Sequence, residues 1–399
     1  MKALAEEGTE IVAVPYHGPP VDSLWWRSER NPGFRYGQGY EAFRRHVRAR
    51  QPQAHDRRDS ATLELRLVQR LVTPRWREHL LSILGREADV DAVVVLTAPL
   101  NHLVGIAPSI RRSFDIPVCY YDGDLPSSLP SHGGFGWGFD MYHGADLSEY
   151  DLVLSNSQGA KSHLLDWGAR RVEVLWWGAD PEVFRPLGVV EDIDVLFYGV
   201  GVEHRQDWLT ELITRPSERL PHRRFVVAGR NLDLDFGATE RMGVIPPSQL
   251  GALVARSRIQ LNVSRSPHAE CYASATTRLF EVASMERAIV TRPVEGLSEW
   301  FAPDKEVAVV HSADEAVATY ERLLTDTDER LEMGRAARQR VVADHTYRHR
   351  ARELLGHLSS VVATRPSARF NRAGERATDS ATSVANATPK SSGYWPTGS

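Results

Sequence analysis

The stretch that decides the fold is TTRLFEVAS, residues 276–284, which is followed by RAIVT, residues 287–291. The first part predicts a short helix, because Thr276 is a good N-cap residue and leucine, phenylalanine and alanine give the helix an apolar side. The second part predicts a short buried strand. A helix start collects backbone N–H groups and positive dipole, which suit a phosphate. Glu281 lies farther along, where its carboxylate can bond ligand hydroxyls, so the stretch fits a nucleoside-diphosphate sugar.

Apolar, strand-like runs alternate with helical patterns on both sides of this stretch. The runs cover residues 11–14, 92–96, 116–121, 152–154, 172–175, 195–198, 225–228, 259–263, 288–290 and 307–310. Continuous apolar strands separated by helices indicate parallel sheets that are covered on both faces. Glycine and proline interrupt the pattern between residues 178 and 188. We therefore expect two α/β domains with a ligand cleft between the carboxyl ends of their strands.

Composition and charge exclude several classes of function. The 399 residues suffice for two domains, and a net charge of -4 gives no general reason to expect a nucleic-acid partner. No apolar run has the length of a transmembrane segment, and the acidic start of the chain is unlike a signal peptide. Cys119 and Cys271 indicate neither a disulfide framework nor a metal site, and no other cluster has metal-ligand spacing. We expect a cytoplasmic protein that binds no metal.

Two further segments have unusual composition. Residues 27–58 hold many arginines and several aromatic residues, which fits either a solvated, partly helical insertion or a surface for an anionic acceptor. HGGFGWG, residues 132–138, predicts a mobile loop that could stack an acceptor sugar.

Six motifs occur in an informative order along the chain. They are YDLVLSNS at 150–157, WGADPEVFRPL at 177–187, DIDVLFYG at 192–199, RLFE at 278–281, EGLSEWF at 295–301 and HTYRHRA at 345–351. As an ordered set they resemble the retaining GT-B glycosyltransferases, especially the spore-maturation (CgeB-like) group. The resemblance covers roughly residues 90–357.

The resemblance implies an α/β fold of the GT-B type, in which two Rossmann-like parallel-sheet domains face a cleft. The N-terminal, acceptor-side domain would span residues 1–187, and the C-terminal, nucleotide-sugar-binding domain residues 188–345. Residues 346–362 would form a helix that packs back toward the first domain. Residues 363–399 lack periodicity and are expected to be disordered.

The start of the chain departs from the family pattern. Residues 3–12 resemble the end of the family's first helix and its second strand. We therefore expect the first domain to lack its usual opening strand, or to use a homodimer contact or another partner to cover the exposed sheet.

The resemblance also implies an activity, the transfer of a sugar from a nucleoside-diphosphate sugar to an acceptor. The acceptor could be a small molecule, a glycan or a protein. Such hexosyltransferase-like enzymes retain the anomeric configuration and need neither a metal nor another cofactor, and a donor phosphate oxygen receives the acceptor proton. Two alternatives stay open: a nucleotide-sugar epimerase on the same fold, and a non-catalytic module that binds a sugar or a partner.

The diphosphate requires close backbone approach and positive charge. Gly199 and Gly201 follow the first strand of the second domain, where they can admit phosphates to the backbone. Arg205 comes next and is the first candidate for a phosphate clamp, because its guanidinium is forked and permanently charged. The alternative is a solvated arginine at a helix start.

A second positive charge is also expected. Many relatives carry a lysine where this chain has Thr210, so Arg265 or Arg278 would supply that charge instead. Thr276 and Thr277 complete the predicted phosphate site, because they open the helix whose first N–H groups face the ligand.

The resemblance divides the rest of the donor between carboxylates. Glu281 aligns with the glutamate that binds the nucleotide ribose. Ala273 stands where many members carry a second glutamate that contacts the donor sugar, so Glu270 and His268 are the nearest candidates for that role. The departure indicates a variant donor pocket, a shifted loop or weak activity.

Two residues of the first domain are candidates for the chemistry. Asp122 ends a strand at the cleft, where it could orient an acceptor hydroxyl or offset positive charge on the sugar ring. The alternative is a turn aspartate, since Asp-Gly-Asp is also good turn chemistry. His102 follows another strand end, and its alternative is an ordinary loop histidine.

Overall fold

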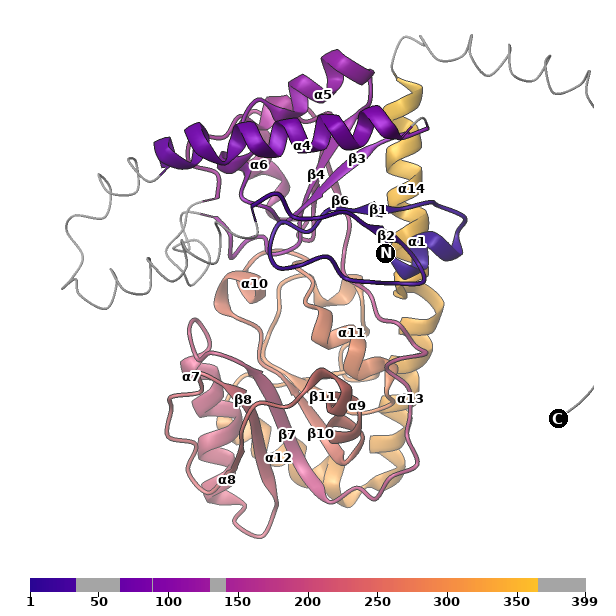
Figure 1. The fold of residues 1–399 in the computed structure, drawn as a ribbon. Coiled ribbons are helices and arrows are strands. Elements are labelled where there is room, and N and C mark those ends of the chain that lie inside the picture. The colour runs from indigo at the N-terminus through magenta and orange to yellow at the C-terminus, as the bar shows by residue number, and fades with distance from the viewer. Residues whose placement is uncertain (34–64, 88, 130–140, 365–399) are drawn as a thin grey trace, which may run out of the picture.

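The computed structural model of the chain describes residues 1–33, 65–87, 89–129 and 141–364. Most of the arginine-rich segment, the glycine-rich loop and the tail from residue 365 lie outside these ranges, so the interpretations given for them stay predictions. Within the described ranges, two α/β domains lie one above the other, and the C-terminal helices run along one side (Figure 1).

The first domain is built on a four-stranded parallel sheet in the order β3-β4-β5-β6. Its strands are β3 (Val93–Leu96), β4 (Val118–Asp122), β5 (Leu152–Ser155) and β6 (Val172–Val174). The connecting helices are α4 (Thr73–Arg86), η1 (Leu100–His102), α5 (Ile106–Phe114), η3 (Leu147–Glu149) and α6 (Lys161–Asp166). Every residue of β4 is buried, as the apolar run predicts for a central parallel strand.

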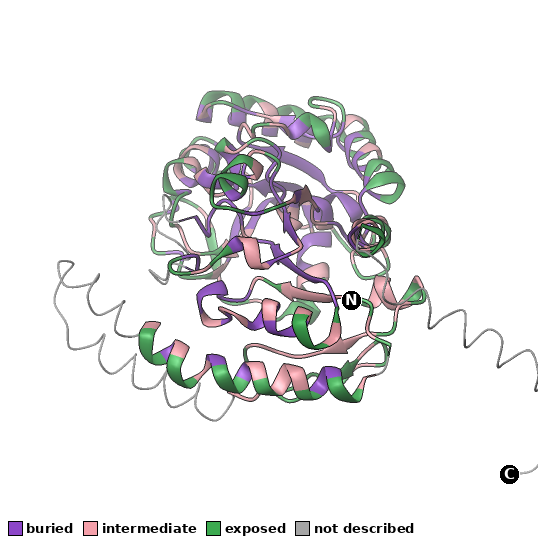
Figure 2. Ribbon diagram, turned by 90° about the horizontal axis from the view of Figure 1, so that it is seen from above, coloured by how far each residue is buried: buried purple, intermediate pink, exposed green. Residues whose placement is uncertain are grey.

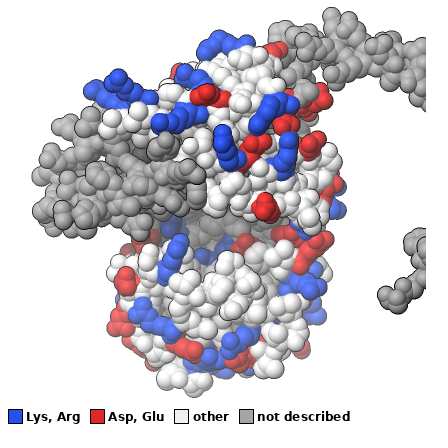
Figure 3. All heavy atoms as spheres, viewed as in Figure 1, with Lys and Arg blue, Asp and Glu red and all other residues white. Residues whose placement is uncertain are grey.

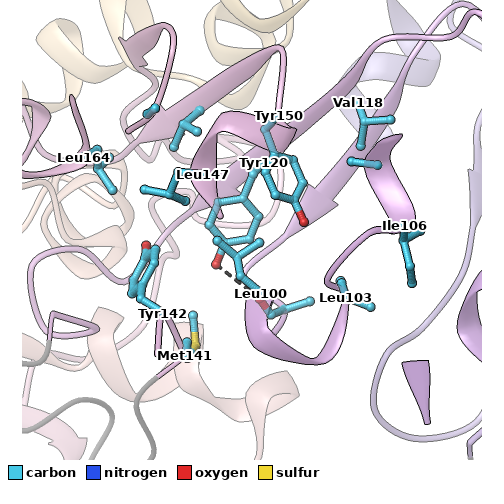
Figure 4. Close-up of a cluster of buried hydrophobic side chains, with 14 of the residues drawn as sticks. Leu100, Leu103, Ile106, Val118, Tyr120, Met141, Tyr142, Leu147, Tyr150 and Leu164 are labelled. Carbon is cyan, nitrogen blue, oxygen red and sulfur yellow. Dashed lines mark hydrogen bonds between the residues drawn. The ribbon is translucent and has the colours of Figure 1, made fainter. Parts of the chain in front are cut away.

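Three tyrosines form the centre of this domain's core. The ring of Tyr120, on β4, lies 6.5 Å from that of Tyr142 and 5.8 Å from that of Tyr150. Buried leucines such as Leu100 and Leu147 surround them (Figure 4). Large rings at this position fix β4 against the segment 141–150, which matters for the site because β4 ends at Asp122.

The start of the chain packs beside this domain. Helix α1 (Lys2–Glu6) contacts α14 (Tyr347–Ala363). Strands β1 (Val12–Ala13) and β2 (Arg27–Ser28) pair in parallel with each other and, in the part of the chain that the structure describes, form a sheet of their own. The strand predicted at residues 11–14 therefore exists, but it lies outside the four-stranded sheet. The predicted partner or homodimer contact stays a prediction.

The second domain holds a six-stranded sheet in the order β12-β11-β10-β7-β8-β9, with every pair parallel. Its strands are β7 (Ile193–Val200), β8 (Phe225–Arg230), β9 (Glu240–Met242), β10 (Ser257–Asn262), β11 (Ala288–Thr291) and β12 (Ala308–Val309). Its helices are α7 (Gln206–Leu209), η4 (Thr210–Thr214), α8 (Arg215–Arg219), α9 (Pro247–Ala255), α10 (Ser266–Glu270), α11 (Thr277–Ser284), η5 (Leu297–Glu299), α12 (Ala313–Thr325) and α13 (Thr327–Asp344). The stretch at residues 276–291 thus forms α11 and β11, as predicted.

The chain passes between the domains at two adjacent points. Ala179 forms a parallel bridge with Thr346, and its N–H donates to the carbonyl of His345 at 3.0 Å. Gly178 permits this approach, because a Cβ there would lie 2.8 Å from the carbonyl oxygen of His345. Beyond this crossing, α14 returns to the first domain and buries Leu354 against the sheet face opposite the tyrosine core.

Burial follows the layered arrangement. Seen from above, buried residues lie along the strands, while exposed residues cover the outer sides of the helices (Figure 2). None of the helices within the described ranges combines the length and the apolar character that a bilayer crossing requires.

Candidate functional site

Three arginines converge at the carboxyl edge of the second sheet. Arg205 is the N-cap residue of α7, Arg265 that of α10, and Arg278 lies in the first turn of α11. A Cβ on Gly199 would lie 3.2 Å from Nη1 of Arg205 and 3.1 Å from Nη2 of Arg278. The two guanidinium groups therefore meet over Gly199, where a side chain would crowd them. We call these three residues the arginine cluster.

Within the arginine cluster, Arg205 is buried and Arg265 and Arg278 are partly buried. Nε and Nη1 of Arg205, Nε of Arg265 and Nε of Arg278 are buried without a hydrogen-bond partner among the described residues. Burial, together with the charges of Arg278 and Arg265, lowers the pKa of Arg205 to about 9. Like charges held together away from water favour an anion that accepts their hydrogen bonds. Basic side chains also occur in the recess between the domains on the face drawn in Figure 3.

The start of α11 adds backbone donors to the arginine cluster. Thr276 is the N-cap residue with an extended backbone, and its side chain makes no capping hydrogen bond. Thr277 is the first helical residue, next to Arg278. Gly201 has a φ of +72°, which favours glycine, and it turns the chain after β7 toward Arg205. The predicted phosphate residues therefore lie on adjoining elements.

Glu281 occupies the second turn of α11. It is partly buried, and its carboxylate accepts no hydrogen bond from any residue that the structure describes. Burial raises the pKa of Glu281 to about 7, against the opposing effect of Arg278. Tyr347, at the start of α14, is near enough for the Glu281 charge to add to the rise of its own pKa. A ligand hydroxyl could satisfy this carboxylate.

Asp122 lies deeper than its sequence context suggests. It is fully buried, and its carboxylate accepts hydrogen bonds from Ser128 Oγ at 2.5 Å, Tyr142 OH at 2.5 Å and the backbone N–H of Asp124 at 2.9 Å. Burial raises the pKa of Asp122, and these hydrogen bonds oppose the rise. Such a group holds the following turn in place. The catalytic role predicted for Asp122 stays a prediction.

His102 belongs to the first domain in its contacts. Its Nδ1 pairs with the hydroxyl of Tyr16, and its carbonyl accepts a hydrogen bond from Thr73 Oγ1 at 2.7 Å. Burial, followed by the nearby His17, lowers the pKa of His102 to about 4, so the ring is neutral at pH 7. These contacts do not connect His102 with the arginine cluster, and its predicted role is untested.

The predicted donor-sugar residues, His268 and Glu270, make other contacts in the structure, and their role stays a prediction. Nδ1 of His268 pairs with Ser274 Oγ at 2.8 Å. Glu270 is exposed and lies 3.6 Å from Arg292. Ala273 is fully buried with a φ of +48°, and its Cβ would be 3.1 Å from a Cβ on Gly296. The position of the missing glutamate thus points into the protein.

Two residues near the site were not predicted from the sequence. Asp124 follows Gly123 after β4 and lies close enough to Arg265 for that charge to lower its pKa. Arg292, buried directly after β11, donates to Ser266 Oγ at 3.1 Å and lies over the ring of Trp208. The signal for both was their place immediately beyond a strand end, where parallel sheets bind ligands.

The segment before α11 is fastened to the first domain. Ser274 forms an antiparallel bridge with Ser157, just beyond β5. The N–H of Ala275 donates to the carbonyl of Asn156 at 3.2 Å, and the side chain of Asn156 donates back to the carbonyl of Ala275 at 3.2 Å. The predicted phosphate-binding helix therefore begins at the junction of the two domains.

Comparison with known proteins supports this assignment of the fold. Residues 205–356 match a family model described as glycosyl transferase-like. No curated protein matches the chain. Sucrose-phosphate synthase from Thermosynechococcus elongatus has a similar structure, with a TM-score of 0.61 and 13% sequence identity over 91% of this chain and 92% of that chain.

Two more solved structures show the same arrangement. Trehalose-6-phosphate synthase OtsA gives a TM-score of 0.58 at 14% identity, over 89% of this chain and 92% of that chain. Anabaena HepE in complex with UDP-glucose gives a TM-score of 0.52 at 14% identity, over 67% of this chain and 78% of that chain. The predicted GT-B fold of two parallel-sheet domains is therefore confirmed, and a glycosyl transferase-like region occupies most of its second domain and extends into α14.

Proposed function

We propose that the protein is a glycosyltransferase that moves a sugar from a nucleoside-diphosphate sugar to an acceptor. The observation that carries the proposal is the arginine cluster, whose buried N–H groups lack partners among the described residues. A diphosphate supplies the oxygens and the negative charge that this cluster needs. The matched family model and the UDP-glucose bound to HepE, a protein of similar fold, support the same class of donor.

The arginine cluster also suits the chemistry. Negative charge develops on the diphosphate as the bond between it and the sugar breaks, and fixed positive groups stabilise that charge without reorganising. Arg205, Arg265 and Arg278 would hold the diphosphate with the start of α11, and Glu281 would bind the ribose. The arginines provide the charge that a metal provides in other transferases, so our proposal needs no metal or cofactor.

The finer features of the proposal rest on the resemblance. We infer retention of the anomeric configuration, with a donor phosphate oxygen taking the acceptor proton, and membership of the CgeB-like group. The six motifs between residues 150 and 351 support both. Cys119 and Cys271 are free thiols, which is compatible with the cytoplasmic location that we infer.

Calorimetry with nucleoside diphosphates tests the proposal. We expect one of UDP, GDP and TDP to bind the wild-type protein, and Arg205→Gln and Arg278→Gln each to weaken that binding by about 1.5–3 kcal/mol, the value of a charged hydrogen bond. Arg335→Gln is the matched control, because Arg335 is exposed on α13 of the same domain. Absence of binding by all three would refute the donor class. Release of the nucleoside diphosphate from its sugar conjugate, measured with and without EDTA, tests donor cleavage and its metal independence.

A further inference from the structure

The turn after β4 is fixed from several sides. Asp122 accepts three hydrogen bonds within and around it. The N–H of Gly123 donates to Thr97 Oγ1 at 3.0 Å, and the indole N–H of Trp177 donates to the carbonyl of Gly123 at 3.0 Å. A Cβ on Gly123 would lie 2.4 Å from the Trp177 ring, so the position requires glycine. The backbone therefore presents the next residue, Asp124, in one direction.

That direction is toward the second domain. The residue after Asp124, Leu125, accepts a hydrogen bond through its carbonyl from Ser274 Oγ at 3.1 Å. Ser274 lies two residues before Thr276, the N-cap of α11. Arg265, a member of the arginine cluster, is close enough to lower the pKa of Asp124. The Asp124 carboxylate therefore lies at the domain junction on the side of the arginine cluster.

The carboxylate of Asp124 is also without a hydrogen-bond donor among the described residues. Asp124 is partly buried. Burial, followed by the charge of Asp122, raises the pKa of Asp124 to about 6 despite Arg265. A partly desolvated carboxylate without partners gains when a ligand hydroxyl donates to it. The neighbouring Asp122 cannot take this part without giving up its own hydrogen bonds.

The residues of the second domain that the sequence suggests for the sugar are less suited to this contact. Ala273 points into the interior. Glu270 has a side chain that is 67% exposed and faces Arg292, and His268 is paired with Ser274. If the diphosphate occupies the arginine cluster, the sugar that it carries must lie beside it, and Asp124 is a partly buried carboxylate available on the side of the first domain.

We propose that Asp124 determines donor specificity by accepting hydrogen bonds from hydroxyls of the transferred sugar, so that the first domain supplies the sugar contact in this chain. This inference rests on the proposed function, since it places the diphosphate on the arginine cluster. The turn held by Asp122 positions Asp124 for this contact.

The test compares each nucleoside diphosphate with its sugar conjugate. Calorimetry gives dissociation constants for UDP, GDP and TDP and for UDP-glucose, GDP-mannose and TDP-glucose, and the ratio of conjugate to diphosphate isolates the sugar's contribution. We use the pair that the wild-type protein binds most tightly. Asp124→Asn should raise this ratio about tenfold and leave the affinity for the diphosphate within about twofold. Asp166→Asn, at an exposed position on α6, is the matched control and should change neither.

The outcomes separate the two proposals. If the wild-type protein binds a diphosphate and the ratio rises only in Asp124→Asn, the inference holds. If the ratio is unchanged in a variant whose thermal unfolding matches wild type, Asp124 does not contact the sugar, while the proposed function stands. If the wild-type protein binds none of the diphosphates, both proposals are wrong.

Discussion

Arg205 and Arg278 carry like charges and yet extend over the same ring, that of Phe197, with guanidinium carbons 6.0 and 5.2 Å from its centroid. The ring face attracts both cations and offsets part of their repulsion. The remaining repulsion contributes to the lowered pKa of Arg205, for which burial is the largest cause and Arg278 the next. Affinity for an anion and stability without one should therefore oppose each other at this site.

Removal of one charge should raise stability without an anion and lower affinity for an anion. Arg205→Met should raise the free energy of unfolding at pH 7 by about 1–2 kcal/mol without an anion, because a buried, unpaired charge is replaced by an apolar chain. Inorganic pyrophosphate should stabilise the wild-type protein and stabilise the variant much less. Thermal unfolding with and without pyrophosphate measures both effects, with Arg335→Met as the exposed control. A variant that is less stable without pyrophosphate would contradict the account.

Gly199→Ala should weaken the site by displacing the guanidinium groups. The new Cβ would lie 3.0 Å from Phe197 Cζ and 3.1–3.2 Å from the two arginine side chains, so those flexible ends must move. We expect affinity for the bound nucleoside diphosphate to fall about tenfold, with little loss of stability. Calorimetry and thermal unfolding give the two quantities. Gly188→Ala has no atom within 4 Å of its Cβ and should leave affinity unchanged.

Glu281→Gln should make stability less dependent on pH. The folded-state pKa of Glu281 is raised from 4.5 to about 7, so its stabilising contribution is full below pH 4.5 and is lost as pH rises through 7. Glutamine removes that loss. The variant should therefore exceed the wild type by about 1–3 kcal/mol at pH 8 and match it near pH 4.5. Urea unfolding at both pH values measures the difference, and an equal difference at both would count against a buried carboxylate.

Gly178→Ala should destabilise the crossing between the domains. Its Cβ would meet backbone atoms, at 2.8 Å from the carbonyl oxygen of His345 and 2.9 Å from the carbonyl carbon of Thr346. Backbone cannot yield as a side-chain end does, so we expect a loss of about 1–3 kcal/mol in the free energy of unfolding. Urea unfolding beside Gly188→Ala, which lies ten residues along the same connection, isolates the effect of the clash. Equal stability of the two variants would show that the crossing tolerates the methyl group.

Periodicity alone predicted most of the sheet structure. The apolar runs correspond to the strands of both sheets apart from β9, whose sequence Glu240–Met242 is mostly polar. Strand β2 was also not predicted, because its two residues, Arg27 and Ser28, are polar. Apolar strands can be predicted from composition, whereas short polar strands depend on pairing with neighbours that are distant in the chain.

The site was predictable only in part. Arg205 and Arg278 could be proposed because glycines and a helix start lie beside them in the sequence. The difference between Asp122 and Asp124 could not be predicted. It depends on a hydrogen bond to the Asp122 carboxylate from Tyr142, which lies 20 residues farther along the chain. Which of two adjacent carboxylates faces a ligand is decided by packing, and packing leaves no local pattern.

At Ala273 the sequence expectation and the structure differ most. Many relatives of the resembled family carry a glutamate at this position, yet the structure turns it inward, where Ala273 N–H donates to the carbonyl of Glu295 at 2.9 Å and its Cβ faces Gly296. Ala273→Glu should therefore fail to restore a sugar contact. A carboxylate buried among the apolar neighbours of Ala273 should lower the free energy of unfolding by about 3–5 kcal/mol. Denaturant unfolding together with donor calorimetry measures both effects; tighter binding of a nucleotide sugar by this variant would show that the 268–273 segment can turn toward the ligand, and would return the sugar contact to the second domain.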